Sequence, residues 1–152
     1  MKINSLEKFI GSGFYTGFFP FASGTVGSLA AIIIYLIPGF EQLFIIIPFT
    51  LIFLLYGIFV GTKFEAQYGK DPSECTVDEI VGTWISLIAL PKSVLIIVIT
   101  FIIWRLLDII KPPPARKLEK LKGGLGIMTD DIISGLYTLL IMHVVVYLSG
   151  KF

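Results

Sequence analysis

Long stretches without a charged side chain dominate this chain and predict helices that cross a membrane. Residues 43–60 and 132–148 form uncharged runs of 18 and 17 residues. Each would make a helix of about 26 Å, close to the roughly 30 Å hydrocarbon core of a bilayer. Residues 24–37 predict a shorter first crossing that ends at Pro38-Gly39. None of these runs alternates between polar and apolar residues as a barrel strand does. The predicted fold class is therefore all-α, a small polytopic helical membrane bundle with interfacial loops.

A further apolar stretch, residues 80–107, is interrupted by Pro91-Lys92. One continuous helix would place both residues near the bilayer centre, whereas two helices, residues 80–90 and 94–107, form a short helical hairpin. The hairpin puts ten of the twelve Lys and Arg residues on one face and leaves Lys92 and Lys151 on the other. Because basic residues collect in cytoplasmic loops, this favours the hairpin with the N-terminus and both long loops in the cytoplasm. The first arm is short, so a re-entrant segment buried among other helices is the alternative to a full crossing.

Composition supports the membrane class. Of 152 residues, 55% are hydrophobic and 15% are charged, which excludes an ordinary water-soluble globule of this size. The length predicts a single domain over residues 1–152. The formal net charge of +1 gives no indication of a nucleic-acid partner, and none is expected, while the basic loop 111–122 should attract anionic membrane lipid. The lone Cys75 excludes an internal disulfide. Residues 1–10 lack the pattern of a removable signal peptide. Trp84 and Trp104 are expected to anchor the chain at the membrane interface.

Polar residues gather in three groups on the predicted cytoplasmic face. The first group combines Gly11-Ser12-Gly13 with the segment 23–28, immediately before a predicted helix. Glycines let a backbone approach a ligand closely, and free amides and hydroxyls at a helix start suit a phosphate. Close packing between membrane helices is the alternative explanation of such small residues. The candidate phosphate-binding residues of this group are Ser12, Gly24, Thr25, Gly27 and Ser28.

The other two groups supply charged side chains. Asp78-Glu79 and Asp130-Asp131 each begin a predicted apolar helix. Arg105 and Asp108 share one helix face, and Lys111 lies where three consecutive prolines end that helix. Helix capping, or an ion pair between Arg105 and Asp108, would explain single members of these groups.

Five carboxylates on one membrane face would repel one another unless a cation lies among them. Mg²⁺ prefers oxygen ligands and commonly bridges one or two carboxylates to a substrate phosphate. Arg105 and Lys111 could then contact a phosphate that carboxylates alone would repel. These residues predict metal-assisted phosphoryl chemistry at a lipid surface, with the candidate metal ligands Asp78, Glu79, Asp108, Asp130 and Asp131.

Taken together, these motifs resemble those of the bacterial phosphatidylglycerophosphatase A family over roughly residues 11–147. Members of that family usually carry Pro-Gly-Thr where this chain has Ser23-Gly24-Thr25, so the glycine and the hydroxyl are retained and the proline is not. The matching segments are Gly11-Ser12-Gly13, Gly24-Thr25, Gly27-Ser28, Asp71-Pro72, Val77-Asp78-Glu79-Ile80-Val81-Gly82, Arg105, Asp108-Ile109-Ile110-Lys111-Pro112, Gly123-Gly124-Leu125-Gly126-Ile127-Met128 and Asp130-Asp131.

The resemblance implies an integral inner-membrane phosphatase that requires Mg²⁺ and converts phosphatidylglycerophosphate to phosphatidylglycerol and inorganic phosphate. It also implies an active site that faces the cytoplasm, in agreement with the distribution of Lys and Arg. In this hypothesis the five carboxylates hold one or two Mg²⁺ ions, and Arg105 and Lys111 stabilise the phosphoryl oxygens with help from Thr25. The nucleophile is a water molecule or an aspartate, and the sequence leaves that choice and the oligomeric state open. The expected catalytic residues are Asp78, Glu79, Arg105, Asp108, Lys111, Asp130 and Asp131.

A small ion or proton transporter that binds its cation at the boundary carboxylates is the main alternative. Transport predicts ionisable groups near the middle of the membrane and a route between both faces, whereas these carboxylates crowd one face. A non-catalytic scaffold would leave the grouping of acidic and basic residues unexplained. A phosphoalcohol transferase would require a spaced Asp and Gly motif, which the chain lacks.

Overall fold

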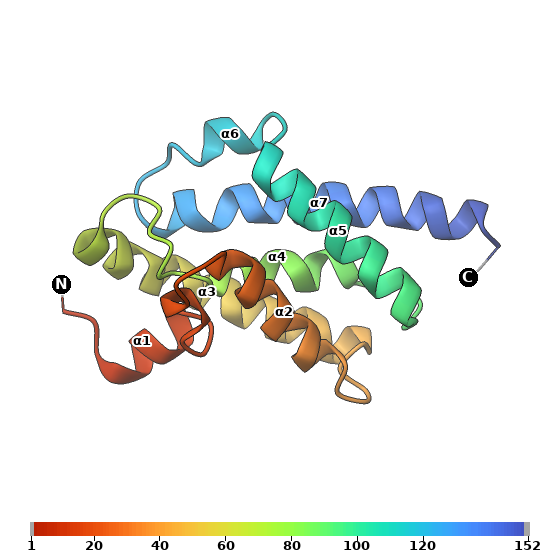
Figure 1. Cartoon of the computed structure of the whole chain (residues 1–152), viewed down its shortest axis with the longest axis horizontal. Coiled ribbons are helices and arrows are strands. Elements are labelled where there is room, and N and C mark those ends of the chain that lie inside the picture. The colour runs from red at the N-terminus through yellow and green to blue at the C-terminus, as the bar shows by residue number, and fades with distance from the viewer. Residues whose placement is uncertain (1, 151–152) are drawn as a thin grey trace.

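The computed structural model describes residues 2–150, which form seven α-helices and one short 3₁₀ helix, with no strand in that range (Figure 1). The all-α prediction is therefore confirmed. The elements in chain order are α1 Ser5–Gly11, η1 Thr16–Phe18, α2 Ser23–Tyr35, α3 Leu43–Tyr68, α4 Val77–Leu87, α5 Val94–Ile110, α6 Ala115–Leu118 and α7 Gly124–Leu148.

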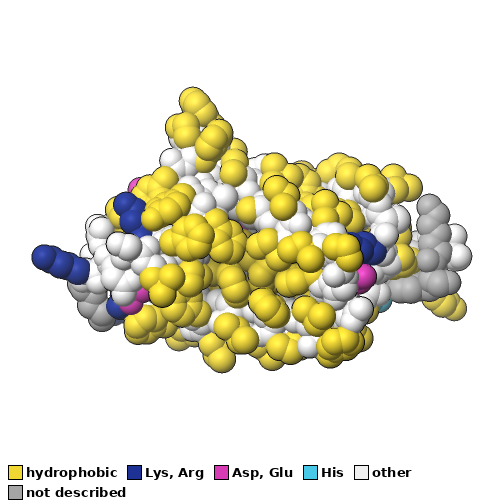
Figure 2. Space-filling model, turned by 90° about the horizontal axis from the view of Figure 1, so that it is seen from below, with side chains coloured by type: hydrophobic (Ala, Val, Ile, Leu, Met, Phe, Trp, Pro, Cys, Tyr) yellow, Lys and Arg dark blue, Asp and Glu magenta, His cyan; other side chains and the backbone are white. Residues whose placement is uncertain are grey.

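Two helices, α3 and α7, are long and apolar enough to cross a membrane. Both contain the spans that the sequence predicts, but α3 continues beyond residue 60 and α7 begins eight residues before 132. Large apolar side chains on both remain exposed, among them Phe44 at 75% and Leu148 at 77%. One face of the molecule shows a broad apolar band between charged groups near its two ends (Figure 2). These features are consistent with a membrane protein.

The predicted hairpin is present, with α4 and α5 joined through residues 88–93. Ten of the eleven residues of α4 are buried, and α4 packs against α2, α3, α5 and α7. A helix of eleven residues spans only about 16 Å, which is short for an average bilayer. Protein on all sides of α4 gives its backbone and side chains an environment that does not depend on lipid thickness.

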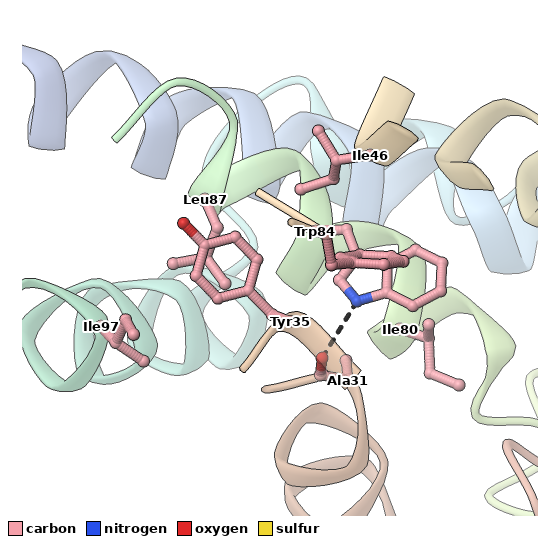
Figure 3. Close-up of a cluster of buried hydrophobic side chains, with 8 residues drawn as sticks. Ala31, Tyr35, Ile46, Ile80, Trp84, Leu87 and Ile97 are labelled. Carbon is pink, nitrogen blue, oxygen red and sulfur yellow. Dashed lines mark hydrogen bonds between the residues drawn. The ribbon is translucent and has the colours of Figure 1, made fainter. Parts of the chain in front are cut away.

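A buried aromatic cluster fixes α2 against α4 (Figure 3). Trp84 is 1% exposed and its Nε1 donates a hydrogen bond of 3.0 Å to the carbonyl oxygen of Ala31. Tyr35 and Ile80 pack in the same cluster. Trp104 is also fully buried. The expectation that the two tryptophans anchor the chain at the membrane interface is therefore wrong, because both indoles fill the protein core instead.

The two ends of the bundle differ in their charges. Lys92 lies in the hairpin turn, where its Nζ contacts Glu41 Oε2 at 2.7 Å and the carbonyl oxygen of Ile37 at 2.9 Å. These contacts join the turn to the connection between α2 and α3, at the end of α4 opposite Asp78. Lys92 thus lies at the end of α4 away from Asp78, while Lys151 lies outside the described residues.

Candidate active site

Three carboxylates from two distant parts of the chain meet at one end of the bundle. Asp78 and Glu79 lie in the first turn of α4, and Asp131 lies on α7. One carboxylate oxygen from each lies within 4.8 Å of the others. We call these three residues the acid triad. It forms because α4 and α7 pack along each other, which brings the start of α4 against the second and third turns of α7.

The predicted position of Asp130-Asp131 at a helix start is wrong. The helix α7 already begins at Gly124, whose backbone N–H donates a hydrogen bond of 2.9 Å to Thr62 Oγ1. The glycine-rich segment 123–126 thus forms the N-cap and the first turn of the helix. Asp130 and Asp131 lie more than one turn inside it and are buried, so helix capping does not explain them.

Each residue of the acid triad has an oxygen atom that is enclosed by protein. Within residues 2–150, Asp78 Oδ1, Glu79 Oε2 and Asp131 Oδ2 are buried and have no hydrogen-bond partner. Buried polar atoms in proteins are nearly always paired, because an unpaired one costs about 1–3 kcal/mol or more. Three converging carboxylates, each with one buried unpaired oxygen, form the kind of donor set that a hard divalent cation such as Mg²⁺ prefers. The residues present therefore fit a magnesium ion.

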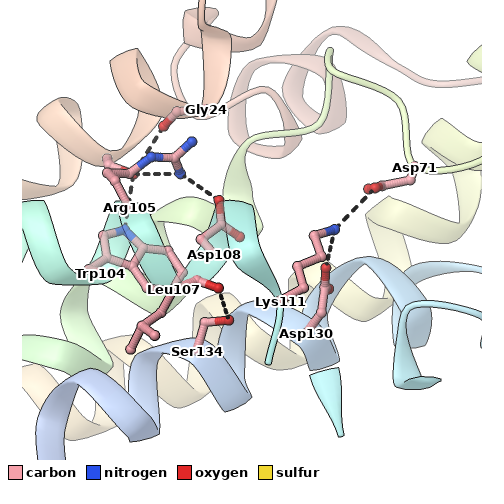
Figure 4. Close-up of polar contacts among 10 residues, drawn as sticks. Gly24, Asp71, Trp104, Arg105, Leu107, Asp108, Lys111, Asp130 and Ser134 are labelled. Carbon is pink, nitrogen blue, oxygen red and sulfur yellow. Dashed lines mark hydrogen bonds and ion pairs between the residues drawn. The ribbon is translucent and has the colours of Figure 1, made fainter. Parts of the chain in front are cut away.

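Arg105 lies on α5, with its guanidinium next to Asp108 and close to Gly24 (Figure 4). Its Nη1 contacts Asp108 Oδ2 at 3.0 Å, which is the predicted pair on one helix face. Its Nε is buried and lacks a hydrogen-bond partner among the residues described. A Cβ atom at Gly24 would lie 3.0 Å from Arg105 Nη2 and 2.2 Å from Glu79 Oε1. The guanidinium and the Glu79 carboxylate thus both lie against α2 at Gly24, where there is no side chain.

Lys111 lies among three carboxylates. Its Nζ contacts Asp130 Oδ2 at 2.6 Å, Glu119 Oε2 at 3.3 Å and Asp71 Oδ2 at 3.7 Å. Burial lowers the pKa of Lys111, but the hydrogen bond to Asp130 and the nearby carboxylates outweigh burial and leave the pKa raised. For Asp71, burial raises the pKa and the charge of Lys111 offsets only part of that effect. Lys111 is therefore a charged link between α7 and two loops.

The sequence predicts that five carboxylates hold the metal, and the structure brings three of them, Asp78, Glu79 and Asp131, together. Asp108 pairs with Arg105, and Asp130 pairs with Lys111. The other two carboxylates are therefore each paired with one of the two basic residues, Arg105 and Lys111, that the sequence assigns to phosphate binding.

Two partners of Lys111, Asp71 and Glu119, are absent from the residues expected in the site. Asp71 precedes Pro72 in a motif of the resembled family, but nothing in its local sequence indicates a pairing forty residues away. Glu119 lies within a basic loop, where a single acidic residue between lysines is the only signal that could have identified it.

The segment 23–28 forms the first two turns of α2 instead of preceding a helix. Ala22, in a left-handed conformation, precedes the helix without a side-chain cap. Gly27 packs against Thr76, and Thr25 is half-buried near the start of the helix. Ser28 is fully buried and donates a hydrogen bond of 3.0 Å to the carbonyl oxygen of Gly24.

Ser12 is separated from this arrangement by its own hydrogen bonds. Its Oγ donates to the carbonyl oxygen of Lys8 at 2.6 Å and accepts from the backbone N–H of Tyr15 at 3.1 Å. The side chain is fully buried. The structure thus gives Ser12 a role in the turn that follows α1, and it brings Gly24 rather than Ser12 against the charged residues.

An apolar helical bundle with buried acidic side chains and half-buried basic ones at one end is typical of a membrane-type enzyme with a polar site. Comparison with known families identifies it further: the model for phosphatidylglycerophosphatase A matches residues 9–146. The chain belongs to the phosphatidylglycerophosphatase A family, which confirms the resemblance noted in its sequence.

Named relatives extend over almost the whole chain. A phosphatidylglycerophosphatase A from Escherichia coli is 34% identical and aligns with 94% of this chain and 85% of its own length. Its counterpart from Haemophilus influenzae is 35% identical over 89% of this chain and 85% of its own length. A protein from Bacteroides thetaiotaomicron, provisionally named a phosphatidylinositol-3-phosphatase, is 38% identical over 95% of this chain and 96% of its own length. No solved structure gives a significant match.

Proposed function

We propose that this protein is a Mg²⁺-dependent lipid phosphatase that hydrolyses phosphatidylglycerophosphate to phosphatidylglycerol and inorganic phosphate at the cytoplasmic face of the bacterial inner membrane. Family membership supports the phosphatase class and the substrate. The observation that carries metal dependence is the acid triad, whose oxygens lie within 4.8 Å of one another. The basic residues that cluster at the same end of the bundle support the cytoplasmic orientation.

The acid triad would hold the magnesium ion through its unpaired oxygens. When bound, Mg²⁺ supplies positive charge that polarises the phosphoryl group and offsets the negative charge of the substrate. Asp78 and Glu79 come from α4, whereas Asp131 comes from α7. The site therefore requires correct packing of two helices, and a ligand set held by packed helices keeps its geometry better than one on loops.

Arg105 is the residue best suited to contact a phosphoryl oxygen. Its Nε is a buried donor that lacks a partner among residues 2–150. Asp108 holds one side of the guanidinium at 3.0 Å and leaves other N–H groups available. Arginine donors match the planar arrangement of phosphate oxygens, and their charge stabilises the transition state of phosphoryl transfer.

Lys111 joins α7 to the loops that carry Asp71 and Glu119, through its ion pairs with three carboxylates. Its Nζ contacts Asp130 Oδ2 at 2.6 Å, while Asp130 Oδ1 is buried without a hydrogen-bond partner among residues 2–150. A direct contact between Lys111 and the substrate would require that one of these ion pairs open. We therefore assign Lys111 mainly to the positioning of Asp130 and of the loops that carry Asp71 and Glu119.

A transporter function is not favoured. The acidic groups of the triad lie at one end of the bundle, and the relatives carry the names of phosphatases. Because the relative from B. thetaiotaomicron is named for a phosphoinositide, a 3-phosphorylated phosphatidylinositol is the second substrate to be tested. It shares with phosphatidylglycerophosphate a phosphomonoester on a lipid headgroup.

The test measures phosphate release by the purified protein in detergent, with each lipid and with soluble glycerol phosphate, first with Mg²⁺ and then with a chelator. We expect release from phosphatidylglycerophosphate that stops with the chelator and returns with Mg²⁺. Asp78→Asn and Asp131→Asn should each reduce turnover at least about 100-fold, as loss of a main electrostatic contact does. Glu41→Gln, at the opposite end of the bundle, is the matched control. Turnover in both aspartate variants near that of the wild type would refute the metal role.

A further inference from the structure

Two buried residues of the described bundle, Ser28 and Trp104, share contacts with the proposed phosphate-binding arginine. Both are fully buried. Trp104 Nε1 donates to Ser28 Oγ at 3.2 Å, and Arg105 Nη1 approaches the same oxygen at 3.5 Å. Ser28 Oγ donates a hydrogen bond of 3.0 Å to the carbonyl oxygen of Gly24. One serine oxygen therefore joins α2 to two adjacent residues of α5.

This hydroxyl has no capacity left for a substrate. A serine hydroxyl has one proton and two acceptor positions. The carbonyl oxygen of Gly24 accepts the hydrogen bond that the hydroxyl donates, and the hydroxyl oxygen accepts from the N–H groups of Trp104 and Arg105. With no exposed surface, Ser28 cannot reach a phosphate in the headgroup region. Its expected role in phosphate binding must therefore be indirect, through the groups that it contacts.

Trp104 is itself held in one position by α4. A Cβ atom at Gly82 would lie 2.1 Å from the Trp104 ring, so the indole packs directly on the backbone of the helix that carries the acid triad. This contact fixes the indole N–H, which in turn orients the Ser28 oxygen toward Arg105. Trp104 of α5 thus contacts both α2, through Ser28, and α4, through Gly82.

We propose that Ser28 and Trp104 are positioning residues that set the orientation of Arg105 toward the substrate phosphate. The contact between Arg105 Nη1 and Ser28 Oγ, at 3.5 Å, is long for a hydrogen bond. The ion pair with Asp108 therefore contributes most of the energy that holds the guanidinium in place. Trp104 fixes the serine oxygen that the guanidinium faces. Ser28 acts on the reaction only through Arg105. This inference rests on the proposed function, because that function assigns Arg105 to the phosphate.

A structural measurement can test these contacts without any activity assay. The chain has two tryptophans, and each indole N–H is bonded, Trp84 to Ala31 and Trp104 to Ser28. In protein labelled with ¹⁵N at the indole nitrogen, Trp84→Phe assigns the two signals. We expect Ser28→Ala to shift the Trp104 signal and leave that of Trp84 in place, and Arg105→Lys to shift the Trp104 signal as well. An unmoved Trp104 signal in either variant would overturn the inference.

The kinetic measurement is a double-mutant cycle on kcat with phosphatidylglycerophosphate and Mg²⁺. Ser28→Ala should lower kcat about fivefold, as expected for one weak hydrogen bond to a charged group, and change KM less than twofold. In the Arg105→Lys background the same change should cost less than twofold, because the group on which Ser28 acts is absent. Ser86→Ala is the matched control, since Ser86 is also buried and bonds only the carbonyl oxygen of Thr83 among the described residues.

Equal losses from Ser28→Ala in both backgrounds would overturn the inference, because a purely structural effect adds independently. A loss no larger than that of Ser86→Ala would overturn it too. By contrast, a wild-type protein that releases no phosphate from the lipid would refute the proposed function, and it would do so whatever the indole signals show.

Discussion

Replacement of Asp131 by asparagine should raise the stability of the protein while it removes activity. Three carboxylates lie with oxygens within 4.8 Å of one another. Two full charges at that distance repel by about 3.5 kcal/mol at an effective dielectric constant of about 20, and Asp131 has two such neighbours. An asparagine keeps the shape of the side chain and removes the charge.

The stability gain will be smaller than the full repulsion, since one of the three carboxylates can take up a proton. We expect an increase of about 2 kcal/mol in the free energy of unfolding when no divalent cation is present. For a protein of this length that corresponds to a rise of about 4–8 °C in Tm. Because Mg²⁺ binds the folded wild-type protein and not the unfolded chain, added Mg²⁺ should raise the Tm of the wild type and have little effect on Asp131→Asn.

Asp130→Asn is the matched control, because it makes the same change at the adjacent residue of α7 with the opposite expected sign. Asp130 lies 2.6 Å from Lys111 and is buried. Loss of a buried ion-pair partner costs about 3–5 kcal/mol when the remaining charge is isolated, and less here because Lys111 keeps Glu119 and Asp71.

The assay is thermal unfolding in detergent, followed by tryptophan fluorescence with chelator and with Mg²⁺. The reasoning would be refuted if Asp131→Asn lowered Tm as much as Asp130→Asn does, because the triad would then hold no net repulsion. If Mg²⁺ raised the Tm of Asp131→Asn as much as that of the wild type, a magnesium site at the triad would be excluded.

Three further predictions concern residues around the site. Gly24→Ala should leave Tm within about 2 °C but reduce turnover at least tenfold, because the new Cβ displaces the flexible end of Glu79; thermal unfolding and phosphate release measure the two effects. Gly82→Ala should lower the stability by about 1–3 kcal/mol, since its Cβ would overlap the rigid, buried ring of Trp104; an unchanged Tm would contradict that packing. Cys75 should resist a water-soluble alkylating reagent in the folded protein, because burial and the nearby Glu79 raise the pKa of its thiol; mass spectrometry before and after unfolding tests this, and rapid labelling of folded protein would count against it.

Much of the fold could be predicted because each membrane helix is encoded locally. An uncharged run of residues must form its backbone hydrogen bonds internally, so its length and ends specify a helix without knowledge of its neighbours. The turn at Pro91-Lys92 could be predicted in the same way, from a proline and a charge inside an apolar stretch. Helix starts are harder to predict: Gly124 and Gly126 resemble a turn in sequence, yet both lie in the first turn of α7, where Gly124 packs against Ile58 and Thr62 of α3.

The candidate site required information that no local pattern contains. The chemistry of Asp78, Glu79 and Asp131 follows from residue type, but their meeting depends on how α4 packs against α7. The partners of Lys111 illustrate the limit, since Asp71 and Glu119 reach it from two loops. Trp104 illustrates the opposite error: an aromatic residue near a helix end suggests an interface anchor, yet tight packing on Gly82 places it in the core.

The burial of α4 explains how a small bundle can hold unpaired carboxylates next to lipid. A carboxylate that faced hydrocarbon would be neutralised or drawn out to water, because an isolated charge is very costly there. The first turn of α4 is instead surrounded by α2, α3, α5 and α7, and Arg105 lies close enough to offset part of the negative charge. At eleven residues the helix is too short to reach across a bilayer by itself, and the proposed function requires its first turn to lie at the depth of a headgroup phosphate. A longer α4 would carry Asp78 and Glu79 out into water, where competing hydration would weaken both the cation site and its hold on the substrate.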